Sequence, residues 1–186
     1  MEKYLAWLDR LTEGAEPVFH RVETAGGAAH QITVIVYHDV PERGMLTGLT
    51  YGLSLAGHPE WRQGRPELCI SVTSEDERWA LAVGYLASTL VHDCPFAYGD
   101  TINVGEPIAG DTAMTAFVVF APAVLDREDF LNVLDAPDGA GPEDVVNIAG
   151  LYPIHDSERR FIHSHGLEAF WSLDWDPFAP GRPSAV

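Results

Sequence analysis

Strongly β-like runs lie on both sides of one long helical segment, and this order constrains the fold more than any other feature of the sequence. Residues 32–37 and 67–72 are rich in branched apolar side chains and precede the segment, whereas residues 114–120 and 145–152 follow it. Some of these runs are close enough to pair as hairpins, while others are joined through helices. The order therefore predicts an α+β domain with a mixed or mostly antiparallel sheet flanked by helices.

The helical segments are marked by their ends and by apolar periodicity. Ser74 and Glu77 match the S-x-x-E pattern of a capping box, which predicts a helix that begins there and runs to about Val91. A second, charged helix is predicted over residues 156–165, with Gly166 ending it. Further expectations are helices over residues 2–12 and 126–134, strands over 18–23 and 46–55, a flexible turn over 25–28 and a loop over 95–107.

The length of 186 residues suits a single domain that can bury a core without disulfide or metal support. We expect the domain to occupy residues 1–175 and the proline-rich tail, residues 176–186, to be flexible. No apolar run approaches the roughly 20 residues needed to span a bilayer, and the first residues do not resemble a signal peptide. With only two cysteines, these features predict a cytoplasmic protein.

The chain is strongly acidic, with 28 Asp and Glu against 11 Lys and Arg and a net charge of -17. Such a charge repels phosphate backbones and anionic lipids, which argues against nucleic-acid and membrane partners. It favours a basic protein partner, because complementary fields speed encounter. Charge alone leaves open that the acidity serves only solubility.

The histidines offer a weak case for a metal site. His155 and Glu158 are about one helical turn apart, but Glu158 and His165 are separated by roughly 10.5 Å along a helix, too far to share one ion. We therefore expect no metal and no cofactor. A metal-dependent hydrolase centred on His155, Glu158 and His92 is kept as the alternative class.

A serine nucleophile is also poorly supported. Residues 52–57 nearly match the G-x-S-x-G pattern around Ser54, but that pattern requires a helix directly after the serine. Gly57 and Pro59 would break such a helix, and the sequence contains no glycine-rich phosphate-binding motif. No catalytic residue is therefore predicted, and the chain is expected not to be an enzyme.

Several short motifs, each weak alone, resemble the suppressor-of-fused domain family in their order and spacing, over about residues 31–171. The motifs that carry the resemblance are Gly52-Leu53-Ser54, His58-Pro59-Glu60-Trp61, Glu67-Leu68-Cys69-Ile70-Ser71-Val72, Trp79, Gly99-Asp100-Thr101-Ile102, Met114-Thr115-Ala116-Phe117, Tyr152-Pro153-Ile154 and Glu158-Arg159.

The resemblance implies a protein-binding module. The family's animal namesake encloses an extended peptide of a transcription factor with the help of a second domain, whereas stand-alone bacterial members look like immunity proteins of toxin systems. This chain resembles the latter, so we expect it to neutralise a toxin partner by covering it, and its acidity favours a basic toxin. A general interaction domain without a toxin is the remaining alternative, and the oligomeric state is not predicted.

The candidate partner-binding residues follow from the same motifs. Trp61 lies outside regular structure, where tryptophan is either a core plug or an interface anchor. The other candidates are the polar residues shared with the family, and a buried Glu–Arg pair among them would be structural rather than functional. Addition of a partner strand to an exposed sheet edge is a second possible binding mode. These polar candidates are Glu67, Asp100, Asn103, Glu158 and Arg159.

Overall fold

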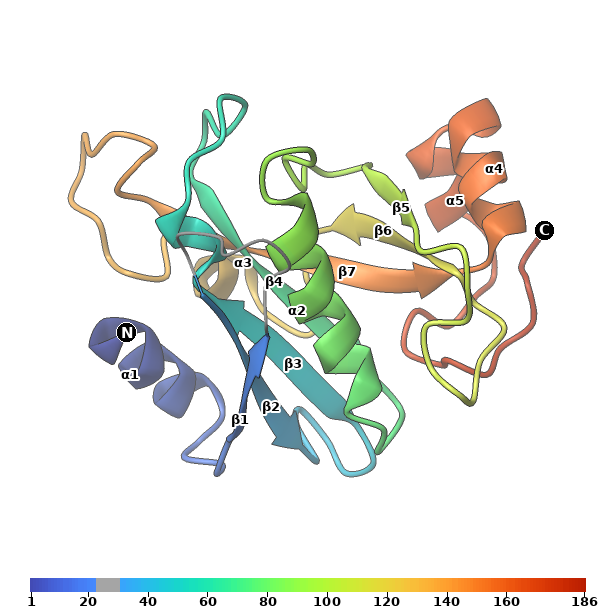
Figure 1. Cartoon of the computed structure of the whole chain (residues 1–186), viewed down its shortest axis with the longest axis horizontal. Coiled ribbons are helices and arrows are strands. Elements are labelled where there is room, and N and C mark those ends of the chain that lie inside the picture. Colours follow the sequence, from blue (N-terminus) through green and yellow to red (C-terminus); the bar gives the residue numbers. More distant parts are fainter. Residues whose placement is uncertain (23–30) are drawn as a thin grey trace.

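A mixed sheet of seven strands forms the body of the molecule (Figure 1). The structure is a computed structural model that describes residues 1–22 and 31–186. The strands are β1 (Val18–Val22), β2 (Ile32–His38), β3 (Leu46–Tyr51), β4 (Arg65–Val72), β5 (Thr101–Asn103), β6 (Ala116–Phe120) and β7 (Val146–Ile154). The helices are α1 (Glu2–Leu11), α2 (Arg78–Leu90), α3 (Arg127–Phe130), α4 (Asp156–His165) and α5 (Leu167–Trp171), with a 3-10 turn η1 (Leu53–Leu55).

The strands lie in the order β1-β2-β3-β4-β7-β6-β5. Every neighbouring pair is antiparallel except β4 and β7, which run parallel in the middle of the sheet with Arg65 opposite Val146 and Cys69 opposite Gly150. The prediction of an α+β domain with a mixed, mostly antiparallel sheet is therefore confirmed.

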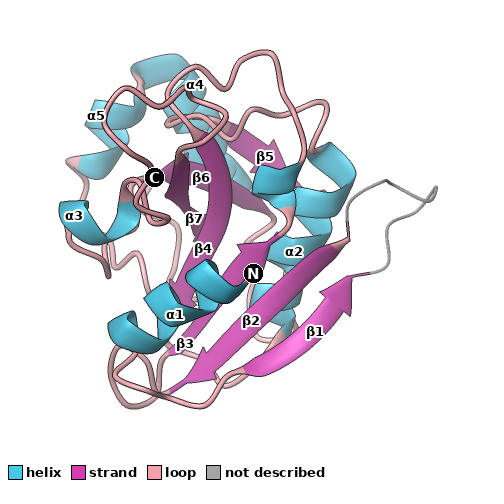
Figure 2. Cartoon of the chain, turned by 90° about the vertical axis from the view of Figure 1, so that its left-hand side faces the viewer, coloured by secondary structure: helices cyan, strands magenta, loops and turns pink. Residues whose placement is uncertain are grey.

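Helices cover both faces of the sheet. Alternate residues of β2 and β4, such as Val34 and Ile70, pack with Trp79 of α2, while their neighbours, such as Ile35 and Cys69, pack with Leu8 of α1. This alternation follows from the two-residue period of a strand, which sends successive side chains to opposite faces. Figure 2 shows α1 in front of the sheet and α2 behind it, while α4 and α5 cover the half of the sheet that contains β6 and β7.

Glycines allow α2 to lie very close to the sheet. A Cβ atom added to Gly84 would be 2.2 Å from Cγ2 of Val34 and 2.9 Å from Cγ2 of Val22. One added to Gly48 of β3 would be 2.4 Å from Cβ of Ala80. Both positions therefore require glycine to keep the helix at this distance.

Replacing Gly84 with alanine is expected to destabilise the fold, although alanine is the better helix former. The gain in helix propensity is about 1 kcal/mol, whereas forcing an extra methyl group into a packed core costs about 1–3 kcal/mol. The free energy of unfolding from urea denaturation should therefore fall by up to about 2 kcal/mol. An increase would show that the helix moves away from β2 at little cost.

The structure differs from the sequence expectations at several element ends. The predicted capping box is wrong: α2 begins at Arg78, Oγ of Ser74 accepts the N–H of Asp76 at 3.1 Å, and Glu77 pairs with His38 instead. Strand β5 lies inside the expected loop, α3 is shorter than the predicted helix, and α5 was not predicted. The turn expected over residues 25–28 lies outside the described residues.

The proline-rich tail lies against the domain without regular secondary structure. The N–H of Thr73 donates to the carbonyl of Phe178 at 2.8 Å, and the hydroxyl of Thr112 donates to the carbonyl of Pro180 at 2.7 Å. Near its end, the N–H of Ala185 donates to Glu158 of α4 at 2.8 Å. The prolines thus exclude a helix or strand, as expected, but they do not keep the tail off the surface. Its predicted flexibility stays a prediction.

Candidate functional site

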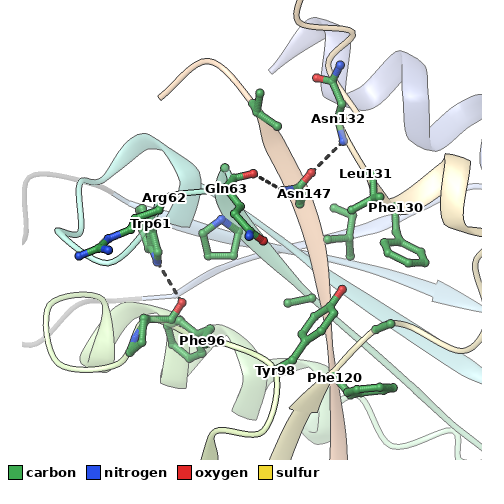
Figure 3. Close-up of a pocket in the computed structure, with 18 of the residues that line it drawn as sticks. Trp61, Arg62, Gln63, Phe96, Tyr98, Phe120, Phe130, Leu131, Asn132 and Asn147 are labelled. Atoms are coloured by element: carbon green, nitrogen blue, oxygen red, sulfur yellow. Dashed lines mark hydrogen bonds between the residues drawn. The ribbon is translucent and has the colours of Figure 1, made fainter. Parts of the chain in front are cut away.

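A groove of about 910 Å³ lies at the end of the sheet where β7 begins. Its walls are the turn before β4, the loop after α2, the end of β6 and the segment that connects α3 to β7 (Figure 3). We call this the β7 groove, and its main lining residues are Trp61, Phe96, Tyr98, Phe120, Phe130 and Ile148. Its size and aromatic lining are typical of a binding site rather than of loose packing.

Trp61 forms one wall of the groove and is held in place. Its indole N–H donates to the carbonyl of Pro95 at 2.9 Å, and its ring lies 5.6 Å from that of His58. The residue is half-buried and packs against the core on the α2 side of the sheet. Trp61 therefore joins the turn before β4 to the loop after α2 and still presents part of its ring to the groove.

Asn147 joins two walls of the groove, the segment between α3 and β7 and the turn before β4. It was not predicted as a site residue from the sequence. Its Oδ1 accepts the N–H of Asn132 at 2.9 Å, and its Nδ2 donates to the carbonyl of Gln63 at 3.1 Å, as the dashed lines in Figure 3 show. Gly64 has a φ of +129°, and a Cβ there would be 2.5 Å from Nδ2 of Asn147. An asparagine within an apolar strand was the only signal for this role.

Tyr98 and Phe120 form the lower, aromatic end of the groove (Figure 3). Their ring centroids are 5.2 Å apart, and Phe120 in turn lies 5.2 Å from Trp171 of α5. Tyr98 is 51% exposed although it is large and apolar. This end of the groove thus offers an accessible aromatic surface on a packed base.

Asp100 supports the groove from behind. Its Oδ2 accepts the N–H of Ala97 at 2.8 Å and lies 3.7 Å from Sγ of Cys94. These contacts close the loop that carries Tyr98, and the carbonyl of Asp100 also accepts the N–H of Val119 at 2.9 Å. Asp100 and Trp61 are therefore both tied to the loop after α2, so the structure brings these two predicted site residues together.

Glu67 is fully buried and acts as a hub for the turn after β3. Oε1 accepts the N–H of Gly52 at 2.9 Å, and both the N–H and the hydroxyl of Ser54, at 2.9 Å and 2.6 Å. Oε2 accepts the hydroxyl of Thr50 at 2.6 Å. Burial raises the pKa of Glu67, and these hydrogen bonds offset that rise only in part. The side chain is 0% exposed, so it cannot meet a partner in this structure.

Glu158 is also 0% exposed, and it binds the C-terminal tail. The guanidinium of Arg182 forms a two-pronged ion pair with it, Nη1 to Oε1 at 2.5 Å and Nη2 to Oε2 at 2.9 Å. The N–H of His155 donates to Oε2 at 2.8 Å. Burial alone raises the pKa of Glu158, but these donors outweigh it and hold the pKa below its ordinary value. The buried partner of Glu158 is therefore Arg182 and not Arg159 of the predicted set, and the pair joins α4 to the tail.

Asn103 and Arg159 meet at a different place, on the surface near the start of α4. Nδ2 of Asn103 donates to Oδ1 of Asp156 at 3.2 Å, and Nε of Arg159 donates to the same atom at 2.8 Å. The structure thus separates this pair from the β7 groove. Their role as partner contacts stays a prediction.

Two residues of the alternative hydrolase site, His155 and Glu158, form hydrogen bonds with other parts of the fold. Nε2 of His155 lies 3.0 Å from the carbonyl of Arg182, and both oxygens of Glu158 accept hydrogen bonds from the tail or α4. Over residues 1–22 and 31–186, no group of three or more His, Cys, Asp or Glu side chains is placed to hold a metal ion.

None of the helices in that part of the chain is both long and apolar enough to cross a membrane.

The sequence of the chain matches the family described as Suppressor of fused protein (SUFU) over residues 28–183. The chain therefore belongs to the suppressor of fused family, as the sequence motifs predicted. The match includes Arg182, so most of the docked tail belongs to the matching region. None of the curated proteins compared with the chain matches it.

Solved structures share the fold. A SUFU homologue from Neisseria gonorrhoeae superposes with a TM-score of 0.75 at 19% identity, covering 100% of this chain and 96% of that one. The chain in the Sufu–Fu complex superposes with a TM-score of 0.68 at 11% identity, covering 99% of this chain and 91% of that one. Drosophila Suppressor of Fused gives a TM-score of 0.68 at 11% identity, covering 97% of this chain but only 50% of that one.

Proposed function

We propose that this protein binds a basic partner protein in the β7 groove. The observation that carries the proposal is an accessible aromatic groove, with Tyr98 and Trp61 in its walls, beside a strongly acidic segment. Exposed aromatic side chains on a packed base are typical anchors of protein interfaces. The Sufu–Fu complex supports protein binding as the general role, since it contains a chain of the same fold bound to another protein.

The acidic segment, residues 126–144, supplies the charge complementarity. It runs from α3 to β7 and contributes Arg127, Phe130, Leu131 and Asn132 to the groove wall, whereas its carboxylates lie beside the lining residues and not among them. Figure 1 shows its loop projecting from the same end of the molecule as the turn before β4. The only cation in this segment is Arg127, and its carboxylates are Asp126, Glu128, Asp129, Asp135, Asp138, Glu143 and Asp144. A basic partner would be drawn to these carboxylates beside the groove, and salt would weaken the attraction.

The proposed biological role is that of an immunity protein that neutralises a toxin by covering it. A basic toxin, such as one that must attract phosphate, would suit the net charge of -17. We place this activity in the cytoplasm, where the free thiols of Cys69 and Cys94 would stay reduced.

The proposal that the partner is a toxin is tested separately from binding in the groove. The partner is captured from native lysate at low salt, identified by mass spectrometry and expressed alone in a host cell. Growth arrest that co-expression of this protein relieves would support immunity. A partner that is harmless alone would contradict it and leave a general interaction domain.

Replacing Tyr98 with alanine is expected to weaken binding of the captured partner at least tenfold, because it removes an exposed aromatic anchor that is worth about 2 kcal/mol or more at an interface. Tyr85 on α2 is the matched control, since it is 56% exposed against 51% for Tyr98 and does not line the groove. The dissociation constants of the Tyr98→Ala and Tyr85→Ala variants are compared by calorimetry. Equal weakening, or loss only in Tyr85→Ala, would place the site elsewhere.

A further inference from the structure

Strand β1 forms an open edge of the sheet, at the opposite end of the strand order from β5. It pairs with β2 on one side, with Val18 opposite Val36 and Val22 opposite Ile32. On its other side, no strand, turn or loop of the described residues forms a main-chain hydrogen bond with it. Figure 2 shows β1 as the outermost strand of the sheet. An open strand edge of this kind is a template for pairing with another strand.

The other edge of the sheet is shorter and partly covered. Strand β5 has only three residues, and the hydroxyl of Thr101 lies 2.6 Å from Nε2 of His163 in α4. The side chain of Asn103 donates to Asp156 at the start of the same helix. Strand β1 is therefore the longer and more accessible of the two edges, and we expect pairing through the sheet to occur there.

The side chains of β1 leave an apolar surface at its edge. Val18 is 40% exposed and the adjacent Phe19 is 51% exposed. Phe19 lies on the α1 face, beside a hollow of about 370 Å³ that Leu5 and Asp9 of α1 also line. Natural edge strands are commonly protected by charged side chains, proline or a bulge, and the only Lys or Arg within β1 is Arg21. Exposed apolar residues on an open strand edge indicate an interface.

The sequence of β1 is complementary to itself in one antiparallel register. A two-fold axis normal to the sheet places one residue opposite its own copy and keeps each face of the sheet continuous. An axis at His20 pairs all five residues of the strand. Phe19 then lies opposite Arg21 of the second copy, and Val18 lies opposite Val22. An axis at Arg21 would instead place two guanidinium groups against each other, and like charges directly opposite are destabilising.

The two residues that become opposite each other, Phe19 and Arg21, are attracted to one another. Both lie on the α1 face, because residues two apart on a strand point the same way. A guanidinium over an aromatic ring is attracted by its π-system, and a symmetric pair contains two such contacts. Asp9 adds a carboxylate beside Phe19. Within residues 1–22 and 31–186, Arg21 forms no ion pair, so its guanidinium is available to a second copy.

We infer that two copies of this protein associate through their β1 strands, in the antiparallel register with His20 on the two-fold axis. The occupant of the edge is a second copy, because the register that uses the whole strand pairs arginine with phenylalanine and valine with valine. The two His20 rings meet at the axis, and each lies 2.8 Å from the carboxylate of its own Glu77. None of the residues that line the β7 groove lies in β1, so this association is independent of the proposed function.

Sedimentation equilibrium of the intact protein over a wide concentration range tests the association. The fitted mass of wild type is expected to rise from that of one chain toward that of two. Arg21→Glu should raise the dissociation constant of the dimer about tenfold, because two cation–π contacts are lost in each dimer. Arg160→Glu, at an exposed position of α4, makes the same charge change and should leave the dissociation constant nearly unchanged. The double variant Phe19→Arg/Arg21→Phe should recover most of the affinity, because each arginine again faces a phenylalanine.

Disulfide trapping tests the register. His20→Cys places two thiols opposite each other across the axis, so mild oxidation should link the two chains. Val22→Cys places them four residues apart, roughly 13 Å along the strands, and should not link. An equal mixture of Val18→Cys and Val22→Cys chains should form a mixed disulfide. Wild type, which carries the free thiols of Cys69 and Cys94, is the blank.

Several outcomes would overturn the inference. They are a wild type that keeps the mass of one chain at every concentration, equal weakening by Arg21→Glu and Arg160→Glu, and trapping of Val22→Cys as efficient as that of His20→Cys. A wild type that stays a single chain, but captures a lysate protein that Arg21→Glu loses, would assign the β1 edge to another partner and would also overturn self-association.

Discussion

Replacing Glu158 with alanine is expected to lower the free energy of unfolding by about 3–5 kcal/mol, the usual cost of removing one member of a buried ion pair. The change leaves the guanidinium of Arg182, which is only 7% exposed, without its carboxylate. It also removes the acceptor for the N–H groups of His155 and Ala185. Urea denaturation followed by tryptophan fluorescence measures the loss.

The contribution of Glu158 to the free energy of unfolding is also expected to depend on pH. Its folded pKa lies below the value in the unfolded chain, so the stabilisation is fully present above about pH 4.3. It is lost as the pH falls through the lowered folded pKa, because protonation then breaks the pair with Arg182. The difference in unfolding free energy between wild type and Glu158→Ala should therefore shrink in this acidic range.

Two controls distinguish the buried pair from general effects of the substitution. Glu168→Ala removes an exposed carboxylate in the neighbouring α5 and should change the unfolding free energy by less than about 0.5 kcal/mol. The double variant Glu158→Ala/Arg182→Ala should lose less than the two single losses combined, because it leaves no unpaired charge. A loss for Glu158→Ala as small as that for Glu168→Ala would mean that the tail contributes little to the fold.

Replacing Glu67 with alanine is expected to cost about 3–5 kcal/mol, because each buried donor left without an acceptor costs roughly 1–3 kcal/mol. The hydroxyls of Thr50 and Ser54 can rotate toward other acceptors, but the N–H groups of Gly52 and Ser54 cannot. Glu67→Gln should cost less, since it keeps the volume and one acceptor oxygen. Chemical denaturation of both variants gives the two values.

The pH dependence of Glu67 has the opposite sign to that of Glu158. Burial raises its folded pKa above the unfolded value. The contribution of Glu67 to the free energy of unfolding is therefore largest below about pH 4.3, and it declines as the pH rises from there through the folded pKa. Since glutamine does not titrate, the advantage of wild type over Glu67→Gln should be larger at pH 4 than at pH 7. Glu106→Gln, in an exposed loop, is the control and should show no such trend. An advantage that grows with pH would contradict the account.

The sequence predicted the fold class and the main strands, because branched apolar runs such as residues 32–37 and 67–72 favour strands through their local composition alone. It missed β5, whose three residues lie in a polar loop and are strands only because β6 pairs with them. It also misplaced the start of α2, since Glu77 binds His20 and His38 from distant strands rather than capping the helix. Partners that are distant in the sequence produce no local sequence pattern from which these contacts could be predicted.

The site was only partly predictable for the same reason. Trp61 was identified, because tryptophan outside regular structure is unusual. Tyr98 and Asn147 were not, since their roles depend on loops and strands that meet only in the fold. Glu67 and Glu158 were named as partner contacts from their family motifs, and the structure shows both carboxylates buried among donors. Shared polar residues thus marked the packing of the domain more than its accessible surface.

The most direct measurement is photo-crosslinking from within the groove. Tyr98 is replaced by p-benzoylphenylalanine, the protein is irradiated in native lysate, and the adducts are identified by mass spectrometry; the same replacement of Tyr85 is the control. We expect one dominant basic protein joined at position 98, with little adduct at position 85 and less at raised salt. Equal adducts at both positions, or a dominant acidic or nucleic-acid adduct at position 98, would contradict it.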